Sequence, residues 1–164
     1  MQYNLNMVEI AAGERLQITD KPVKTVAVIA IQDGQILTVR HRAGTTAGEG
    51  VTGFPGGRQG DQETEREAAI REFKEETGLD ASADDLTEFP GNFFEADLNF
   101  NGSGKKHATM KIFIASNFTG DLKEAIEVDP EWVPLKRINS GLYETPPNVL
   151  EAIQNAQNFL KDKK

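Results

Sequence analysis

The chain has 164 residues, 38% of them hydrophobic, which suits one globular domain with a substantial core. Its net charge of −8 argues against broad binding to nucleic acid, which depends on neutralising phosphates with Lys and Arg. The absence of cysteine excludes disulfides and thiolate metal sites, and the sequence shows neither a secretory signal nor an apolar run long enough to span a membrane. We expect a cytoplasmic protein, a monomer or homodimer with a single domain over residues 1–164, without a membrane or nucleic-acid partner.

The first half of the chain contains a predicted hairpin of strands. Residues 23–31 are a nearly continuous run of β-branched residues, which is typical of a buried strand. Asp33-Gly34 is a strong turn signal, and residues 36–42 are the predicted return strand. A loop of small residues follows over 43–53.

The second half predicts further strands and a terminal helix. Apolar residues alternate over 94–100, the pattern of a half-buried strand, and the chain returns over 107–116. An acidic loop is predicted at 121–130, followed by a short strand over 131–135 at an edge or end, because it contains a proline. Residues 147–160 predict a helix whose buried stripe is Val149, Ile153, Ala156 and Leu160.

Between these halves, residues 57–79 combine a glycine-rich loop with a helix that ends at Gly78. Residues 62–77 contain neither Pro nor Gly and are rich in helix formers. At about 100° per residue, four carboxylates share roughly a third of the circumference beside an apolar flank: Glu65, Glu72, Glu75 and Glu76. Like charges so placed weaken a helix, but they suit a hard divalent cation, which takes oxygen ligands. The alternative interpretation is a solvated acidic face with Arg and Lys partners.

The same stretch resembles the Nudix box, G-x5-E-x7-R-E-U-x-E-E-x-G-U with U apolar. It matches at every fixed position: Gly57, Glu63, Arg71, Glu72, Phe73, Glu75, Glu76, Gly78 and Leu79. The resemblance implies an α/β fold, a Nudix-like α/β/α sandwich around a mixed central sheet, from about Val23 onward. It also implies an enzyme that hydrolyses the pyrophosphate bond of a nucleoside diphosphate derivative with Mg²⁺, or with Mn²⁺.

The resemblance assigns roles by motif position. Metal ligands would be the carboxylates of Glu72, Glu75 and Glu76, joined by the backbone carbonyl of Gly56. Arg71 would orient these carboxylates through its planar, permanently charged guanidinium. The alternative for Arg71 is an ordinary surface pair with Glu75. Glu63 is expected to support the loop or the helix through hydrogen bonds.

A later segment, 127–132, resembles the Glu-x-x-Pro-x-Trp segment of enzymes that degrade oxidised purine nucleoside triphosphates. Glu127 takes the position of the acid there and is a candidate metal ligand. The alternative is a solvated loop residue, with Glu124 and Glu131 as the next candidates for the acid. The general base is left open between Glu72, which we favour, and Glu127.

Further residues are candidates for contacting a small nucleotide substrate. Arg40, His41 and Arg42 end the second predicted strand, and these basic groups could hold the distal phosphates or the base. Phe54 begins the loop that leads into the box, and Tyr143 is the aromatic residue we expect nearest a nucleobase.

The lead-in Phe-Pro-Gly-Gly and the late segment are most similar to enzymes that convert a (d)NTP to a (d)NMP and pyrophosphate, including those acting on 8-oxo-dGTP. The acidic pair that reads the oxidised base in such enzymes is missing from residues 142–147. One alternative is an ADP-ribose or nucleotide-sugar pyrophosphatase, whose usual Ala-Gly lead-in is absent. Another is a non-catalytic nucleotide-sensing module, although such modules typically lose box carboxylates that this chain keeps.

Overall fold

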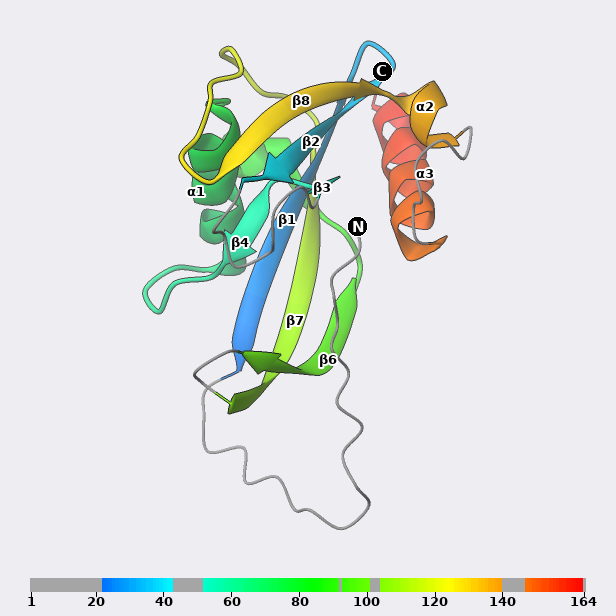
Figure 1. Cartoon of the computed structure of the whole chain (residues 1–164). Coiled ribbons are helices and arrows are strands. Elements are labelled where there is room, and N and C mark those ends of the chain that lie inside the picture. Colours follow the sequence, from blue (N-terminus) through cyan, green and yellow to red (C-terminus); the bar gives the residue numbers. More distant parts are fainter. Residues whose placement is uncertain (1–21, 43–51, 92, 101–103, 140–146, 164) are drawn as a thin grey trace.

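A mixed β-sheet lies between two helices in the computed structural model (Figure 1), which describes residues 22–42, 52–91, 93–100, 104–139 and 147–163. This confirms the predicted α/β/α arrangement. None of the described helices is both long and apolar enough to cross a membrane. In chain order the elements are β1 (Val23–Gln32), β2 (Gln35–His41), β3 (Thr52–Gly53), β4 (Gly56–Arg58), α1 (Glu65–Thr77), the 3₁₀ helix η1 (Ala83–Asp85), β5 (Leu86–Glu88), β6 (Phe94–Phe100), β7 (Gly104–Ala115), β8 (Val128–Pro134), α2 (Leu135–Asn139) and α3 (Pro147–Asp162).

On one side, β1 pairs with two different strands, and the loop between these pairings leads to the helix α1. The main strand order is β3-β2-β1-β7-β5, with β4 on β1, β6 on β7 and β8 on β2. β1 and β7 run parallel, whereas β1 pairs antiparallel with β4 near its start and with β2 near its end. Between these two partners, Val28 N donates to Pro55 O at 2.8 Å. The loop that leads into α1 is therefore fixed to the middle of the sheet.

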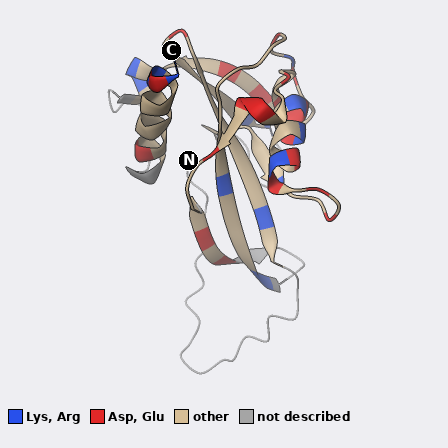
Figure 2. Ribbon diagram, turned by 180° about the vertical axis from the view of Figure 1, so that it is seen from behind, with Lys and Arg blue, Asp and Glu red and all other residues tan. Residues whose placement is uncertain are grey.

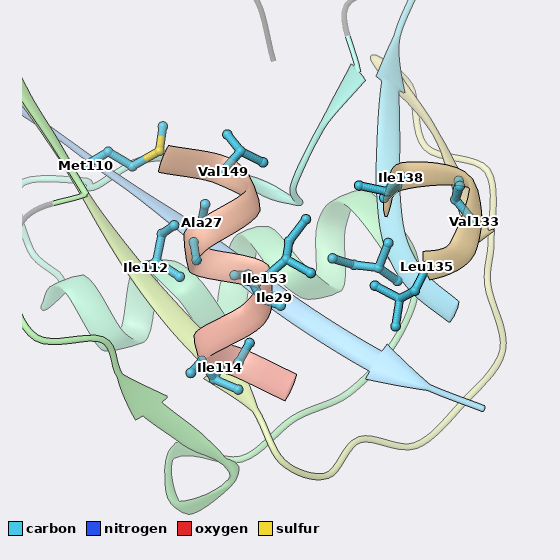
Figure 3. Packing of buried hydrophobic residues seen from close by; sticks show 13 residues of the cluster. Ala27, Ile29, Met110, Ile112, Ile114, Val133, Leu135, Ile138, Val149 and Ile153 are labelled. Atoms are coloured by element: carbon cyan, nitrogen blue, oxygen red, sulfur yellow. The ribbon is translucent and has the colours of Figure 1, made fainter. Parts of the chain in front are cut away.

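The two faces of the sheet are packed by different helices. Side chains alternate across a strand, so Val26, Val28 and Ala30 meet α1 while Ala27 and Ile29 meet α3. Figure 3 shows the α3 side, where Val149 and Ile153 approach Ile29, Ile112 and their neighbours. The predicted stripe of α3 is confirmed at Val149, Ile153 and Ala156, whereas Leu160 is only partly buried and Ala152 is buried instead.

Helix α1 ends where the sequence predicts and begins three residues later. Thr64 caps it in a capping box, in which its side chain accepts from Glu67 N while the Glu67 side chain accepts from Thr64 N. Gly78 adopts the left-handed conformation, with φ of 81°. A side chain at Gly78 would also lie 3.0 Å from Asp121 O, so the residue serves both the helix end and the loop that crosses it.

The predicted hairpin is confirmed, with positive φ at both Asp33 and Gly34. The strand predicted at 94–100 is confirmed, and its partner begins at Gly104 rather than 107.

The predicted acidic loop is wrong at its end, because β8 already begins at Val128. There Pro130 pairs with Val39 of β2, and a proline fits because β8 has β2 as its only neighbouring strand in the described part of the chain. The short elements η1, β5 and α2 were not predicted. Of the predicted loop at 43–53, residues 43–51 lie outside the described part, and Thr52–Gly53 form β3.

Candidate active site

Helix α1 is tied to β4 through two of its carboxylates. Gly56 N donates to Glu76 Oε1 at 2.6 Å. The carboxylate of Glu72 lies over Gly57, where an added Cβ would come within 2.5 Å of Glu72 Cδ. A Cβ at Gly56 would come within 2.1 Å of Val26 O in β1. Glycine at both positions therefore lets the loop pass between β1 and the acidic flank of α1.

Arg71 is the centre of a hydrogen-bond network on this flank. Its guanidinium donates to both oxygens of Glu63, Nε to Oε2 at 3.0 Å and Nη2 to Oε1 at 2.6 Å. Nη1 donates to Glu72 Oε1 at 2.8 Å and to Glu75 Oε2 at 3.2 Å, and Nη2 to Arg58 O at 2.9 Å. One permanently charged side chain thus links three carboxylates with the backbone of the preceding loop. Figure 2 shows acidic and basic residues interspersed along α1.

The carboxylates experience opposite environments. The guanidinium of Arg71, assisted by Gly60 N at 2.7 Å, lowers the pKa of Glu63 to about 2. Burial raises the pKa of Glu72 in spite of its hydrogen bond from Arg71. Burial also raises the pKa of Glu76 to about 8, against the hydrogen bond from Gly56 and with the charges of neighbouring carboxylates adding to the rise. Burial therefore disfavours the charged forms of Glu72 and Glu76, whereas hydrogen bonds favour the charged form of Glu63.

Glu127 reaches this cluster because the chain between β7 and β8 passes around the C-terminal end of α1 (Figure 1). Lys123 N donates to Thr77 O, the last residue of the helix, at 2.9 Å. Arg42 N donates to Glu127 O at 2.9 Å, which fixes the end of this segment beside β2. Among the three acids considered for this loop, Glu127 is the one whose charge acts on Glu76.

The donor set has the chemistry of a site for a hard divalent cation. Carboxylate oxygens are the ligands that Mg²⁺ and Mn²⁺ take, and a cation would favour the charged forms of Glu72 and Glu76, which burial disfavours. Within the described residues, no three His, Asp or Glu side chains converge closely enough to enclose an ion as they stand. Glu76 is turned towards Gly56 N and Glu72 towards Arg71.

The predicted substrate-contacting residues are not gathered at these carboxylates. Arg42 Nε donates to Asp129 Oδ1 at 3.0 Å, and Arg40 lies opposite Asp129 in the β2–β8 register. Both arginines alternate with Leu37, which packs towards α1, so they share the other face of β2. Phe54 packs on the hydrophobic cluster of the α3 side. Tyr143 lies outside the described residues.

His41, the basic residue between these two arginines, lies on the opposite face of β2. It is the last residue of β2 and follows Leu37 and Val39 on the face towards α1. Its Nδ1 is buried and has no hydrogen-bond partner among the described residues. Burial lowers the pKa of His41, opposed by the charge of Glu127. In the sequence, the alternation of side chains along the strand distinguishes His41 from the two arginines beside it.

A family model described as "NUDIX domain" matches residues 21–153, which include both the helix α1 and Glu127. The chain belongs to the Nudix family. It is a Nudix hydrolase, and this family acts on pyrophosphate bonds, generally with divalent metal ions. The box predicted from the sequence thus coincides with the loop from Gly57 and the helix α1.

Several solved structures are similar to this Nudix domain in fold. A MutT structure from work on Aliivibrio salmonicida and Vibrio cholerae is 18% identical, with a TM-score of 0.58 over 83% of this chain and 97% of the other. The ORF135 protein of E. coli is 22% identical, with a TM-score of 0.57 over 84% and 91%. A bifunctional NMN adenylyltransferase/ADP ribose pyrophosphatase from Francisella tularensis, complexed with AMP and a Mn ion, is 19% identical, with a TM-score of 0.56 over 85% of this chain and 42% of the other. No curated protein sequence matches the chain.

Proposed function

We propose that this Nudix hydrolase converts a (d)NTP to a (d)NMP and pyrophosphate with Mg²⁺ held at α1. The observation that carries this proposal is the pair Glu72 and Glu76, two partly buried carboxylates beside the loop at Gly56 whose charged forms are disfavoured by burial, with the charge of Glu127 added. Arg71 compensates Glu63 through both carboxylate oxygens, whereas it bonds a single oxygen of Glu72 and none of Glu76.

The proposed ligands are the carboxylates of Glu72, Glu75, Glu76 and Glu127 and the backbone carbonyl of Gly56. When bound, the cation neutralises charge on the phosphates and lowers the pKa of an attacking water. Mn²⁺ takes the same oxygen ligands and is expected to substitute.

Arg71 acts as a positioning residue, because it holds Glu72 and Glu75 relative to the loop through Glu63 and Arg58 O. We assign Glu72 as the first candidate for the general base that takes the proton of the water, and Glu127 as the second. The charges of both residues act on Glu76, and Glu72 is the more buried of the two.

The remaining substrate contacts stay proposals. Arg42 would have to exchange Asp129 for a phosphate, and Arg40 lies next to the same carboxylate. Phe54 and Tyr143 are proposed near the nucleobase, Phe54 from the α3 side of the sheet. ADP-ribose is the second candidate substrate, because one similar structure is named an ADP ribose pyrophosphatase and holds AMP and Mn.

A competition assay tests the substrate class. The protein with Mg²⁺ is given a mixture of dNTPs, 8-oxo-dGTP, ADP-ribose and dinucleoside polyphosphates, and products are separated by chromatography. We expect a nucleoside monophosphate and pyrophosphate from a triphosphate. Preferential loss of ADP-ribose would favour the second candidate, and nucleotide binding without any product would show a sensing module instead.

The role of Glu127 is tested by Glu127→Gln. The side chain is exposed, so the melting temperature should stay that of the wild type while turnover falls roughly 10²-fold to 10⁴-fold. The matched control is Glu124→Gln in the same loop, where the acid lies near Arg42. Wild-type rates for Glu127→Gln from pH 6 to 9 would contradict the assignment and move the acid to Glu124 or Glu131.

A further inference from the structure

His41 Nδ1 is a buried nitrogen atom without a hydrogen-bond partner among the described residues. Buried side-chain nitrogens and oxygens nearly always have a hydrogen-bond partner, because an unpartnered one has lost its water without compensation. Within the described part of the chain, His41 Nδ1 is the one such atom without a partner.

Backbone contacts place His41 beside the segment that ends at Glu127. His41 pairs with Val128 in the β2–β8 register, and Val128 is 1% exposed. The next residue, Arg42, binds the carbonyl of Glu127 through its backbone N. The backbone on both sides of the ring is therefore fixed beside the segment that ends at Glu127, and Nδ1 has no partner there among the described residues.

The neighbourhood indicates what that partner is. The strand places His41 on the face of β2 that packs towards α1, and the charge of Glu127 acts both on His41 and on Glu76. A neutral imidazole has one N–H, and an N–H beside a cation site is suited to the acceptor oxygens that the cation brings with it. The two arginines of the same strand lie on its other face, Arg42 bonded to Asp129, and cannot serve this position without turning.

We propose that His41 contacts the substrate, donating a hydrogen bond from Nδ1 to a phosphate oxygen of the nucleotide bound at α1. This inference rests on the proposed function, since it requires a polyphosphate at that site. His41 is thereby a substrate-binding residue that selects for a phosphate chain next to Glu127, and it adds no charge of its own when neutral.

Two amide substitutions distinguish the nitrogen atoms of the ring. The amide nitrogen of Asn is bonded to Cγ, as Nδ1 is, whereas that of Gln lies one bond further out and replaces Nε2 instead. We expect His41→Asn to keep most of the wild-type kcat/KM, and His41→Gln and His41→Ala to lose roughly 10-fold to 100-fold. His107→Asn is the matched control, because His107 is the other histidine of the chain and bonds Asp97 and Glu95 on β6.

Imidazole ¹⁵N NMR gives a readout that does not depend on activity. The protein is titrated with Mg²⁺ and an α,β-methylene nucleoside triphosphate, which cannot be cleaved between those phosphates. With two histidines in the chain, the His41→Asn and His107→Asn variants assign every ring signal. We expect Nδ1 of His41 to become the protonated, hydrogen-bonded nitrogen on binding, while the ring of His107 stays unchanged.

Two results would overturn the inference. One is a His41 signal unaffected by a nucleotide that other signals show to be bound, and the other is a His41→Asn variant as impaired as His41→Ala. In either case the wild type still turns over nucleotide, so the proposed function stands. If the wild type neither binds nor cleaves any nucleotide of the panel, both the proposed function and this inference fail together.

Discussion

Glu76 is the residue where activity and stability oppose each other. It accepts a hydrogen bond from Gly56 N, yet burial and the neighbouring carboxylates disfavour its charge. Glu76→Gln keeps an acceptor oxygen for Gly56 and removes the charge. We expect a melting temperature in EDTA no lower than that of the wild type, and a loss of Mg²⁺-dependent turnover of roughly 10²-fold to 10⁴-fold. Thermal denaturation and initial rates on one nucleotide measure both quantities.

The same substitution elsewhere on α1 provides the control. Glu67→Gln removes a charge at the start of the helix, where a Gln side chain can still complete the capping box with Thr64. It should change neither turnover nor melting temperature appreciably. A Glu76→Gln variant that keeps near-wild-type turnover, or that melts well below the wild type without metal, would contradict the assignment.

At the residue scale, the sequence identified the box carboxylates as candidates for the chemistry but could not predict their surroundings. The spacing of Glu72, Glu75 and Glu76 is local, so one helix suffices to bring them together. The partial burial of Glu72 and Glu76 depends on the sheet beneath α1, which the helix pattern does not contain. A related case is the run Arg40, His41 and Arg42, because only the place of β2 in the sheet shows which of these three basic residues faces the helix.

At the scale of elements, the hairpin of β6 and β7 carries a pH-dependent contact. His107 Nδ1 lies 2.8 Å from Asp97 Oδ1 and Nε2 lies 2.7 Å from Glu95 Oε1, so both contacts are hydrogen bonds only when the ring carries two protons. These carboxylates raise the pKa of His107 above its ordinary value. From β1, the nearest charge in register is Lys24, opposite Thr109.

The sign of the pH dependence follows from the raised pKa. The imidazolium binds its proton more tightly in the folded state, so its contribution is complete below pH 6.5, the ordinary value, and is lost as the pH rises through the raised pKa. We expect the amides of β6 to exchange faster at pH 9 than at pH 6 after correction for the intrinsic rate. His107→Gln should remove this difference, and a difference that persists in His107→Gln would refute the contact as its cause.

Long elements followed from the sequence, and short or distant pairings did not. The hairpin of β1 and β2 was predicted because its turn, Asp33-Gly34, directly joins the two strands. The start of β8 was predicted three residues too late. Pro130 indicates a loop unless the strand is known to lie at the edge of the sheet. β3 and β4 span two and three residues, too few to show any period. The parallel pairing of β1 with β7 joins segments more than 80 residues apart, and no local pattern encodes it.

For the whole molecule, the net charge of −8 and the proposed metal site predict different responses to cations. A ligand that binds only the folded state stabilises it by about 2.7 kcal/mol at a hundredfold excess over Kd, which for a chain of this length raises Tm by roughly 5–10 °C. Any salt also screens the repulsion of an acidic protein, and this effect follows ionic strength rather than the identity of the ion.

Thermal denaturation of the wild type in MgCl₂, and in NaCl of equal ionic strength, separates the two effects. We expect the rise in Tm with Mg²⁺ to exceed clearly that with Na⁺, because a cation bound at α1 favours the charged forms of the partly buried carboxylates Glu72 and Glu76 in the folded state alone. Glu76→Gln should respond to the two salts alike, since it retains the rest of the surface charge but lacks one proposed ligand. Equal shifts of the wild type in both salts would mean that Mg²⁺ acts only by screening, and α1 would then hold no metal without a nucleotide.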